Sequence, residues 1–264
     1  MDARSPQYVQ SMIDAGNTGG FWIAAVPVEF VNVAGPRTPK RFVRPKVTYH
    51  HFDVAYPWDP GFKIEPLSDA HAIVVESRTC DLYETYETTY ENGVLSAYSG
   101  WHWSLRRPFS PLPAGTPSAM ASGLSLYAGM VRFEEVASGS IDHALNWGAP
   151  AGTAATRNFV RPASDTDGLA FKGLSRYALP YGAHLRLRAS FDTSRFGPQS
   201  KIIAQAMKTY GIYLADTGGR GNALYNAAAL DGSNHWNASD LAALDAIHIS
   251  DFEVLTLGPV GSVR

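Results

Sequence analysis

The clearest hydrophobic pattern in the chain is the alternation of apolar and polar residues over 184–192. Leu185, Leu187, Ala189 and Phe191 fall on one face, while arginine and serine fall on the other. This pattern is typical of a half-buried strand, because successive side chains of a strand point to opposite faces of its sheet. Stretches rich in β-branched and aromatic residues predict further strands at 21–33, 43–54, 71–77, 79–90, 94–105, 212–216 and 252–255.

Three stretches predict helices. Residues 5–15 begin with a serine and a proline and are followed by a glycine, which are typical residues of helix starts and stops. Residues 197–211 carry a proline near their start and end on a glycine, with apolar residues at helical spacing between them. A short amphipathic helix is expected at 239–247, with Ser239 as its N-cap.

Turn signals separate these elements. Asn92 and Gly93, between two strand-like stretches, predict a β-hairpin. The four prolines of 106–119 predict a surface loop, and 122–136 fits a helix or a strand. Many short strands with two or three short helices predict a mainly β chain, and we expect one β-sandwich or jelly-roll-like domain over 1–264.

Composition and charge exclude several classes of protein. Only 17% of the 264 residues are charged and the formal net charge is −2, so the chain lacks the basic face that nucleic-acid binding needs. It has no apolar run of about 18 residues, so we expect no membrane-spanning helix. Cys80 is the single cysteine and can form neither an internal disulfide nor a cysteine-rich zinc site.

The N-terminal sequence MDARSPQYVQSM shows no basic stretch followed by an apolar one, so no signal peptide is visible. A cytoplasmic protein, a phage-borne protein and a protein whose signal was removed all stay open on this evidence. We expect an extracellular or virion-associated location. Aromatic residues make up 12% of the chain, which is enough to fill a core and also to line a binding surface.

Candidate chemistry is concentrated in the strand 79–90 and the stretch that follows it. Tyr83 and Glu84 lie in that strand, and Trp101 and Trp103 follow the predicted hairpin. Aromatic rings can stack on sugars, and carboxylates can bind sugar hydroxyls or transfer protons, as in a glycan-cleaving cleft. The alternative is structural, because tyrosines favour half-buried strands and tryptophans often fill the cores of sandwiches.

A second acidic stretch contains Glu135 and, eight residues later, His143, which could act as acid and base. The alternative is a solvated turn followed by a core histidine. Asp165 and Asp167 suggest a calcium-binding loop, but the complete calcium-loop motif is not present and a turn is the better interpretation. None of the eight histidines shows the spacing of a metal motif, so we predict no metal ion and no cofactor.

Six collinear segments over 68–255 resemble a largely uncharacterised family of bacterial and fungal proteins, many of them exported. The segments include the motifs G-x-I-x-H-A-L and K-x-Y-G-x-x-x-A-D, at 139–145 and 208–216. The resemblance implies a β-sandwich-like domain of the kind often linked with polysaccharide-active proteins. The retained polar residues are Asp69, His71, Tyr83, Glu84, Glu135 and His143. Asp216 is retained as well, in a position that equally suits a turn cap.

The chain also departs from this family at 113–126, 161–168 and the ADTGG segment. If the family's active site uses those positions, its activity would be altered or lost here.

Together these features predict a carbohydrate-active enzyme, in first place a glycoside hydrolase, that acts on a polysaccharide through paired carboxylates in an aromatic-lined cleft. The expected catalytic group is Asp69, His71, Glu84, Glu135 and His143. The expected substrate-binding residues are Tyr83, Trp101 and Trp103. One alternative is a non-catalytic glycan-binding or structural protein of a filament or virion surface, for which self-association is expected. A histidine-ligated metal enzyme in a cupin-like barrel is a further alternative.

Overall fold

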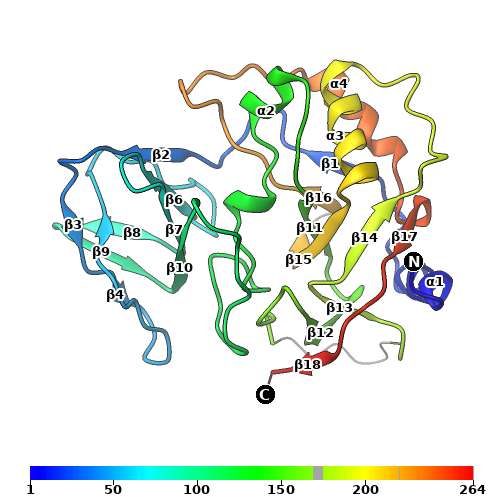
Figure 1. The fold of residues 1–264 in the computed structure, drawn as a ribbon, viewed down its shortest axis with the longest axis horizontal. Helices are drawn as coiled ribbons and strands as arrows, with labels where there is room; N and C mark the ends of the chain where they lie inside the picture. The colour runs from blue at the N-terminus through cyan, green and yellow to red at the C-terminus, as the bar shows by residue number, and fades with distance from the viewer. Residues whose placement is uncertain (169–174, 220, 264) are drawn as a thin grey trace.

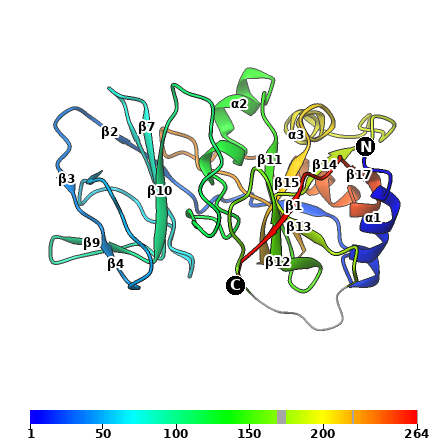
Figure 2. The ribbon, with the colours of Figure 1, turned by 60° about the horizontal axis from the view of Figure 1, so that its bottom comes forward.

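The computed structural model describes residues 1–168, 175–219 and 221–263, and these form two regions that lie side by side (Figures 1 and 2). We call them the strand region and the sheet–helix region. The strand region comprises β2 (Val31–Ala34), β3 (Lys40–Arg41), β4 (Arg44–Pro45), β5 (Tyr56–Pro57), β6 (Ala72–Glu76), β7 (Asp81–Tyr86), β8 (Thr89–Glu91), β9 (Val94–Ala97) and β10 (Ser99–Ser104).

The sheet–helix region is built on a mixed sheet with the described strand order β1-β16-β11-β15-β14-β17. The pairs β1–β16 and β11–β15 are parallel, and the remaining neighbours are antiparallel. A smaller sheet with the order β13-β12-β18 adjoins it. The strands are β1 (Phe21–Ile23), β11 (Leu145–Pro150), β12 (Ala154–Val160), β13 (Leu179–Tyr181), β14 (His184–Leu187), β15 (Ile212–Gly219), β16 (Asn222–Leu224), β17 (Phe252–Val254) and β18 (Val260–Ser262).

Two helices pack on the core of this sheet. Met12 of α1 (Ser5–Asp14) and Met207 of α3 (Pro198–Thr209) are fully buried in the same apolar cluster as Trp147 of β11. Burial of these apolar side chains is the main force that holds the helices on the sheet. The other described helices are η1 (Tyr127–Gly129), α2 (Phe133–Ser138), α4 (Ala238–Leu241), η2 (Ala242–Ala246) and η3 (Ile249–Asp251).

In the strand region, the inner strands β7 and β6 of the sheet β10-β7-β6-β2 are mostly buried on both faces. Val74 and Tyr83 pack into an apolar cluster inside the strand region. Ile73 and Leu82 point the other way, into a cluster that also contains Ala215 of β15. Because adjacent residues of a strand enter different clusters, this sheet is the layer through which the two regions share a core.

Several sequence predictions are confirmed. The predicted helices at 5–15 and 197–211 are α1 and α3, and the chain is mainly β. The predicted hairpin joins β8 to β9, with positive φ angles at Asn92 (52°) and Gly93 (80°), as a tight two-residue turn requires.

Other predictions need correction. The expected strand at 43–54 is reduced to the two residues of β4, and the chain then turns away as an irregular segment. The sandwich or jelly roll is not confirmed, because the largest described sheet is mixed and packs against helices.

No described helix is long and apolar enough to cross a membrane.

Candidate functional site

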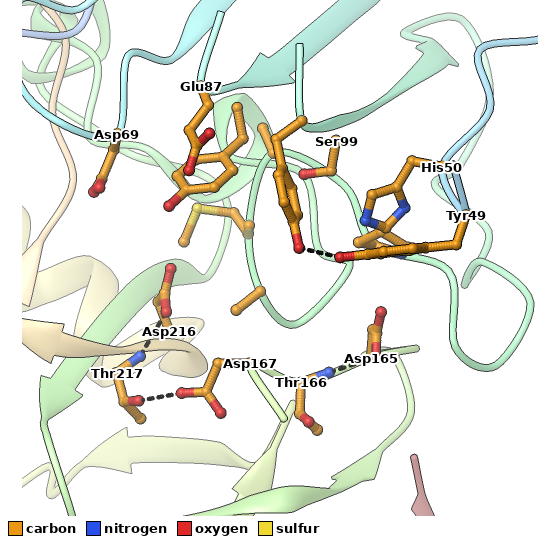
Figure 3. A pocket seen from close by; sticks show the side chains of 16 residues that line it. Tyr49, His50, Asp69, Glu87, Ser99, Asp165, Thr166, Asp167, Asp216 and Thr217 are labelled. Carbon is orange, nitrogen blue, oxygen red and sulfur yellow. Dashed lines mark hydrogen bonds between the residues drawn. The ribbon is translucent and has the colours of Figure 1, made fainter. Parts of the chain in front are cut away.

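A pocket of about 530 Å³ lies where the two regions meet, and carboxylates line it from both sides. Asp69 and Glu87 belong to the strand region, and Figure 3 shows them across the pocket from Asp165, Asp167 and Asp216 of the sheet–helix region. Ligand pockets are commonly formed between structural units and have volumes of roughly 300–1,000 Å³. Position and size therefore both suit a small-molecule or oligomer site.

Backbone contacts fix the wall that carries Asp69 and Glu87. The Glu87 N–H donates to the Asp69 carbonyl oxygen at 2.8 Å, and the Thr88 N–H donates to the Ala70 carbonyl oxygen at 3.0 Å. Ala70 and Glu87 both adopt left-handed backbone angles, with φ of 44° and 49°. This conformation costs a non-glycine residue about 1–2 kcal/mol, and such strain is concentrated at functional sites. The backbone of Ala70 and Glu87 therefore fixes the relative positions of the Asp69 and Glu87 carboxylates.

The opposite wall is a loop that is tied to a second loop. The Ser122 carbonyl oxygen accepts hydrogen bonds from the N–H groups of Ser164 and Asp165, at 2.9 and 3.2 Å. The Thr166 N–H donates to Asp165 Oδ1 at 2.9 Å, but burial raises the pKa of Asp165. The segment with Asp165 and Asp167, which the sequence predicted to be a turn, is thus part of the pocket wall.

Asp167 is anchored to two strands. Its Oδ2 atom accepts a hydrogen bond from the Tyr181 hydroxyl of β13 and another from the Thr217 hydroxyl of β15, each at 2.7 Å. Because both donors come from rigid strands, the carboxylate of Asp167 is held beside Asp216, which directly precedes Thr217.

A β-bulge points Asp216 into the pocket. Trp147 of β11 pairs with Leu214 of β15, but the next pair is Gly148 with Asp216, so Ala215 is an extra residue in β15. Such a bulge reverses the side-chain alternation beyond it. Trp147 and Leu214 face the apolar core, and Asp216 would share that face without the bulge. With the bulge it faces the pocket.

The environment of Asp216 favours its protonated form. Burial raises the pKa of Asp216 to about 7, and the neighbouring Asp167 and Asp69 act in the same direction. The Thr217 N–H, which donates to Asp216 Oδ1 at 2.7 Å, and the nearby His71 lower the pKa by less. A carboxyl group with a pKa near neutral pH is suited to donate a proton to a reacting group.

Aromatic side chains form one side of the pocket. The rings of Tyr86 and Tyr98 meet edge-on, with centroids 6.0 Å apart. The Tyr98 hydroxyl is 2.5 Å from the Tyr49 hydroxyl, and this hydrogen bond raises the pKa of Tyr98 to about 12. Tyr49 and His50 come from the irregular segment after β4, so the loss of the predicted strand is what brings them to the pocket.

A smaller pocket of about 250 Å³ adjoins the first and shares Tyr49, His50 and Pro117 with it. Trp101 lines this second pocket, as does Phe52. We call the two pockets together the groove. The second pocket adds space beyond the carboxylates.

Glu84, expected in the catalytic cleft, lies in the core instead. It is fully buried, and its carboxylate accepts hydrogen bonds from the Ser125 hydroxyl at 2.9 Å and the N–H groups of Leu126 and Tyr127 at 3.0 and 2.7 Å. Burial raises its pKa to about 7 although the three donors lower it. Glu84 therefore stabilises the start of η1 and does not line the pocket.

Glu135 and His143 do meet, as their sequence spacing suggested, but outside the groove. Glu135 Oε2 is 3.2 Å from His143 Nε2, and the other oxygen of Glu135 pairs with Arg132. Partial burial opposes ionisation of Glu135, yet His143 and Arg132 together lower its pKa. Arg132 also donates to the Tyr127 carbonyl oxygen at 2.7 Å, so this cluster stabilises the connection between η1 and α2.

His71 lies behind the pocket wall in a buried cluster. Its Nδ1 atom is 2.8 Å from Glu29 Oε1 and 2.9 Å from Glu65 Oε2, and its Nε2 atom is 3.2 Å from the Ala119 carbonyl oxygen. Burial lowers the pKa of His71, but the two carboxylates outweigh it and raise the pKa well above its ordinary value. Among the described residues, these three side chains form the one acidic or histidine group compact enough to hold a metal ion.

The predicted substrate-binding residues divide between core and groove. Tyr83 is buried against Tyr56, with ring centroids 4.8 Å apart, on the face of β7 opposite Glu84. Trp103 is 8% exposed and fills the core between the two regions. Trp101 alone of the three lines the groove.

Of the predicted site residues, the structure thus brings Asp69 and Trp101 to the groove. Sequence reasoning missed Glu87 and Tyr86 at the end of the strand it favoured, and it treated Asp216 as a turn cap. An acidic residue that ends an apolar strand, as in IYLAD, is a signal that could have identified Asp216.

In comparisons with known proteins, the chain matches no family model, no curated protein and no solved structure. The family resemblance stated from the sequence motifs therefore stays a prediction.

Proposed function

We propose that the protein is a carbohydrate-active enzyme, a glycoside hydrolase that binds a polysaccharide in the groove and cleaves it at the pocket. The observation that carries this proposal is that carboxylates from two regions face each other across a pocket with a tyrosine wall. Glycosidases use two carboxyl groups on either side of the scissile bond. Asp69 is one of the residues expected from the sequence, and Asp216 takes the role that the sequence analysis gave to Glu84 or Glu135.

In the proposed reaction, Asp216 donates its proton to the glycosidic oxygen as the bond from that oxygen to the anomeric carbon breaks. Asp69, on the opposite wall, either attacks the anomeric carbon or accepts a proton from the attacking water. The sum of the steps is the addition of one water molecule across the bond. Asp167, held by Tyr181 and Thr217, lies close enough to Asp216 to favour its protonated form.

The charge of the pocket indicates the class of sugar. Five carboxyl groups line it, and the field of the ionised ones disfavours uronic acids and other anionic sugars. A neutral polysaccharide or one that carries amino groups fits better. Tyr86, Tyr98 and Tyr49 offer ring faces or edges and hydroxyl groups that suit sugar units.

A glycan-binding protein without catalysis is the second candidate. The groove continues past the carboxylates to Trp101, as a binding surface for a polymer would. The departures from the resembled family fall partly on the wall that carries Asp165 and Asp167, which favours this alternative if those positions are catalytic. An extracellular or virion-associated location, predicted from the sequence, suits either function.

The proposal is tested by incubating the protein with a panel of a neutral β-glucan, chitosan and bacterial cell-wall glycan, with new reducing ends and unsaturated products both measured. We expect reducing ends on a neutral or amino-sugar polymer, and a loss of about 10²–10⁴-fold in Asp216→Asn. Asp14→Asn, an exposed carboxylate of α1, is the matched control and should retain full activity.

Full activity in Asp216→Asn would exclude Asp216 as the acid. Unsaturated products would show that the protein cleaves the polymer by elimination and not by hydrolysis. Binding of a panel member without turnover, measured by calorimetry, would favour the second candidate.

A further inference from the structure

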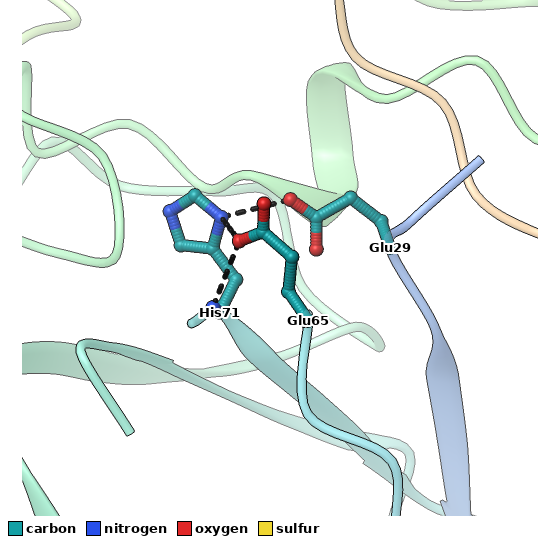
Figure 4. Close-up of side chains that lie close together, drawn as sticks. All are labelled: Glu29, Glu65 and His71. Carbon is teal, nitrogen blue, oxygen red and sulfur yellow. Dashed lines mark hydrogen bonds and ion pairs between the residues drawn. The ribbon is translucent and has the colours of Figure 1, made fainter. Parts of the chain in front are cut away.

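Three side chains form a buried cluster behind the pocket wall. Glu29, Glu65 and His71 are each between 5% and 7% exposed, and their nearest ligand atoms all lie within 4.8 Å of one another. Figure 4 shows both carboxylates directed at Nδ1 of the His71 ring. No sequence motif marks this cluster, because its members come from three separate segments and lack metal-motif spacing.

The hydrogen bonds of His71 require a positive centre in the cluster. Nε2 faces the Ala119 carbonyl oxygen at 3.2 Å, and this oxygen can only accept, so Nε2 carries a hydrogen. In a neutral ring Nδ1 then has a lone pair, which would face two carboxylate oxygens at 2.8 and 2.9 Å. Such an arrangement is repulsive unless a proton or a metal ion lies between the three atoms.

Charge balance limits how the cluster can be neutral. With one proton on His71 and both glutamates ionised, a net negative charge is left in a buried site, so a metal ion or a second proton on Glu29, whose pKa burial raises, is needed. The charged groups that act on Glu29 are His71, Glu65 and Asp69, of which only His71 can be positive. A divalent cation with a neutral histidine would balance both carboxylates.

The second oxygen of Glu29 points to the same conclusion. Glu29 Oε2 is buried, and no hydrogen-bond donor among the described residues reaches it. A buried carboxylate oxygen without a donor costs roughly 1–3 kcal/mol or more. Proteins seldom keep such an atom unless a ligand or ion satisfies it.

We propose that Glu29, Glu65 and His71 bind a divalent first-row transition-metal ion of the Zn²⁺ type, with His71 coordinating through Nδ1. Carboxylates and an imidazole form a ligand set that suits such ions. The contact from Nε2 to the Ala119 carbonyl oxygen is the outer hydrogen bond that metal-binding histidines usually make, and it fixes the tautomer.

This metal would connect the two regions. Glu29 pairs with Ala227 in the sheet–helix region, and the Ala228 N–H donates to the Glu29 carbonyl oxygen at 3.0 Å. His71 directly precedes β6 of the strand region, and Ala119 lines the pocket. The ion therefore has a structural role that does not depend on the proposed hydrolase activity.

The test is the metal content of the untagged full-length protein, purified without chelator and measured by plasma mass spectrometry. We expect close to one equivalent of zinc or a similar ion per chain, and at least tenfold less in Glu29→Gln. Glu135→Gln, which alters the other histidine–glutamate pair, should keep its metal. Dipicolinate should lower the melting temperature, and Zn²⁺ but not Mg²⁺ should restore it.

Co²⁺ added to the chelated wild-type protein provides a test that needs no variant to fold. A strong visible absorption band at one equivalent, removed by competing Zn²⁺, is expected for a site with nitrogen and oxygen ligands and few coordination positions. The proposal would be overturned in favour of a shared proton if the protein is metal-free, binds neither ion and has the same melting temperature with and without dipicolinate. Equal metal content in wild type and Glu29→Gln would also overturn it.

Discussion

Gly148 lies directly opposite Asp216 in the β11–β15 pair, and a Cβ atom on Gly148 would come within 2.9 Å of the Tyr225 hydroxyl. The bulge at Ala215 brings these two residues into register. The extra residue in β15 therefore sets the position of the principal pocket carboxylate, and the lack of a side chain at Gly148 leaves room for the Tyr225 hydroxyl.

The raised pKa of Asp216 predicts that the protein loses stability as the pH rises. Because the folded-state pKa is about 7 and the ordinary value is 3.8, the folded protein binds the proton more tightly. This contribution is complete below about pH 4 and is lost as the pH rises to about 7. Asp216→Asn removes the titration and keeps an oxygen that can accept the Thr217 N–H.

We expect Asp216→Asn and wild type to be equally stable at pH 4. At pH 8 the variant should be more stable by about 4 kcal/mol, because the folded-state pKa lies roughly three units above the ordinary value. Urea unfolding at both pH values measures the difference. The charged groups that act on Asp216, namely Asp69, His71 and Asp167, are the same in both proteins. Parallel pH profiles for the two proteins would contradict the raised pKa.

Glu84→Gln should reduce stability and leave catalysis intact. The amide nitrogen would replace an oxygen that accepts a hydrogen bond, and it would face the N–H groups of Leu126 or Tyr127 in a fully buried site. We expect a loss of about 2–4 kcal/mol in the free energy of unfolding, measured with urea. Glu91→Gln, an exposed change in β8, should alter it by less than about 0.5 kcal/mol. A stable Glu84→Gln protein without activity would restore the catalytic role first expected from the sequence.

Tyr98→Ala should weaken substrate binding more than it slows the reaction. Removal of this ring takes away one contact of the aromatic wall and frees Tyr49. We expect KM to rise about three- to tenfold with kcat within twofold, as the loss of one ring contact implies. Steady-state kinetics on the polymer identified from the panel measure this, with Tyr210→Ala at the end of α3 as the control. An unchanged KM would mean that the substrate does not contact this wall.

Two glycine substitutions should separate steric from conformational cost. Gly123 and Gly139 both have positive φ angles, of 73° and 98°. A Cβ atom on Gly123 would lie 1.9 Å from the Ser164 hydroxyl oxygen, while one on Gly139 would meet nothing within 4 Å. We expect Gly139→Ala to cost about 1 kcal/mol and Gly123→Ala more than about 3 kcal/mol.

Thermal unfolding of the two proteins checks this order. Gly123→Ala should also lower activity, because Ser164 precedes Asp165 in the pocket wall. Similar melting temperatures would show that the contact between the loops at 115–123 and 163–165 can relax.

Much of the local structure could be predicted from the sequence. The helices α1 and α3 and the hairpin after β8 depend on neighbouring residues, such as a proline at a helix start or Asn92 and Gly93 in a turn. The prediction of a strand over 43–54 was wrong, because most of these residues form an irregular segment. This segment places Tyr49 beside Tyr98. That contact joins parts of the chain that a local pattern does not connect.

The sequence by itself determined a mainly β chain of low charge, with carboxylates and aromatic rings available for a sugar-binding site. Only the tertiary structure decided which of them meet. Alternation along β7 puts Tyr83 and Glu84 on opposite faces. In its buried position Glu84 accepts hydrogen bonds from backbone N–H groups. The bulge turns Asp216 to the pocket that Asp69 lines from the other region. Register and burial arise from contacts between distant segments, so no local pattern could fix them.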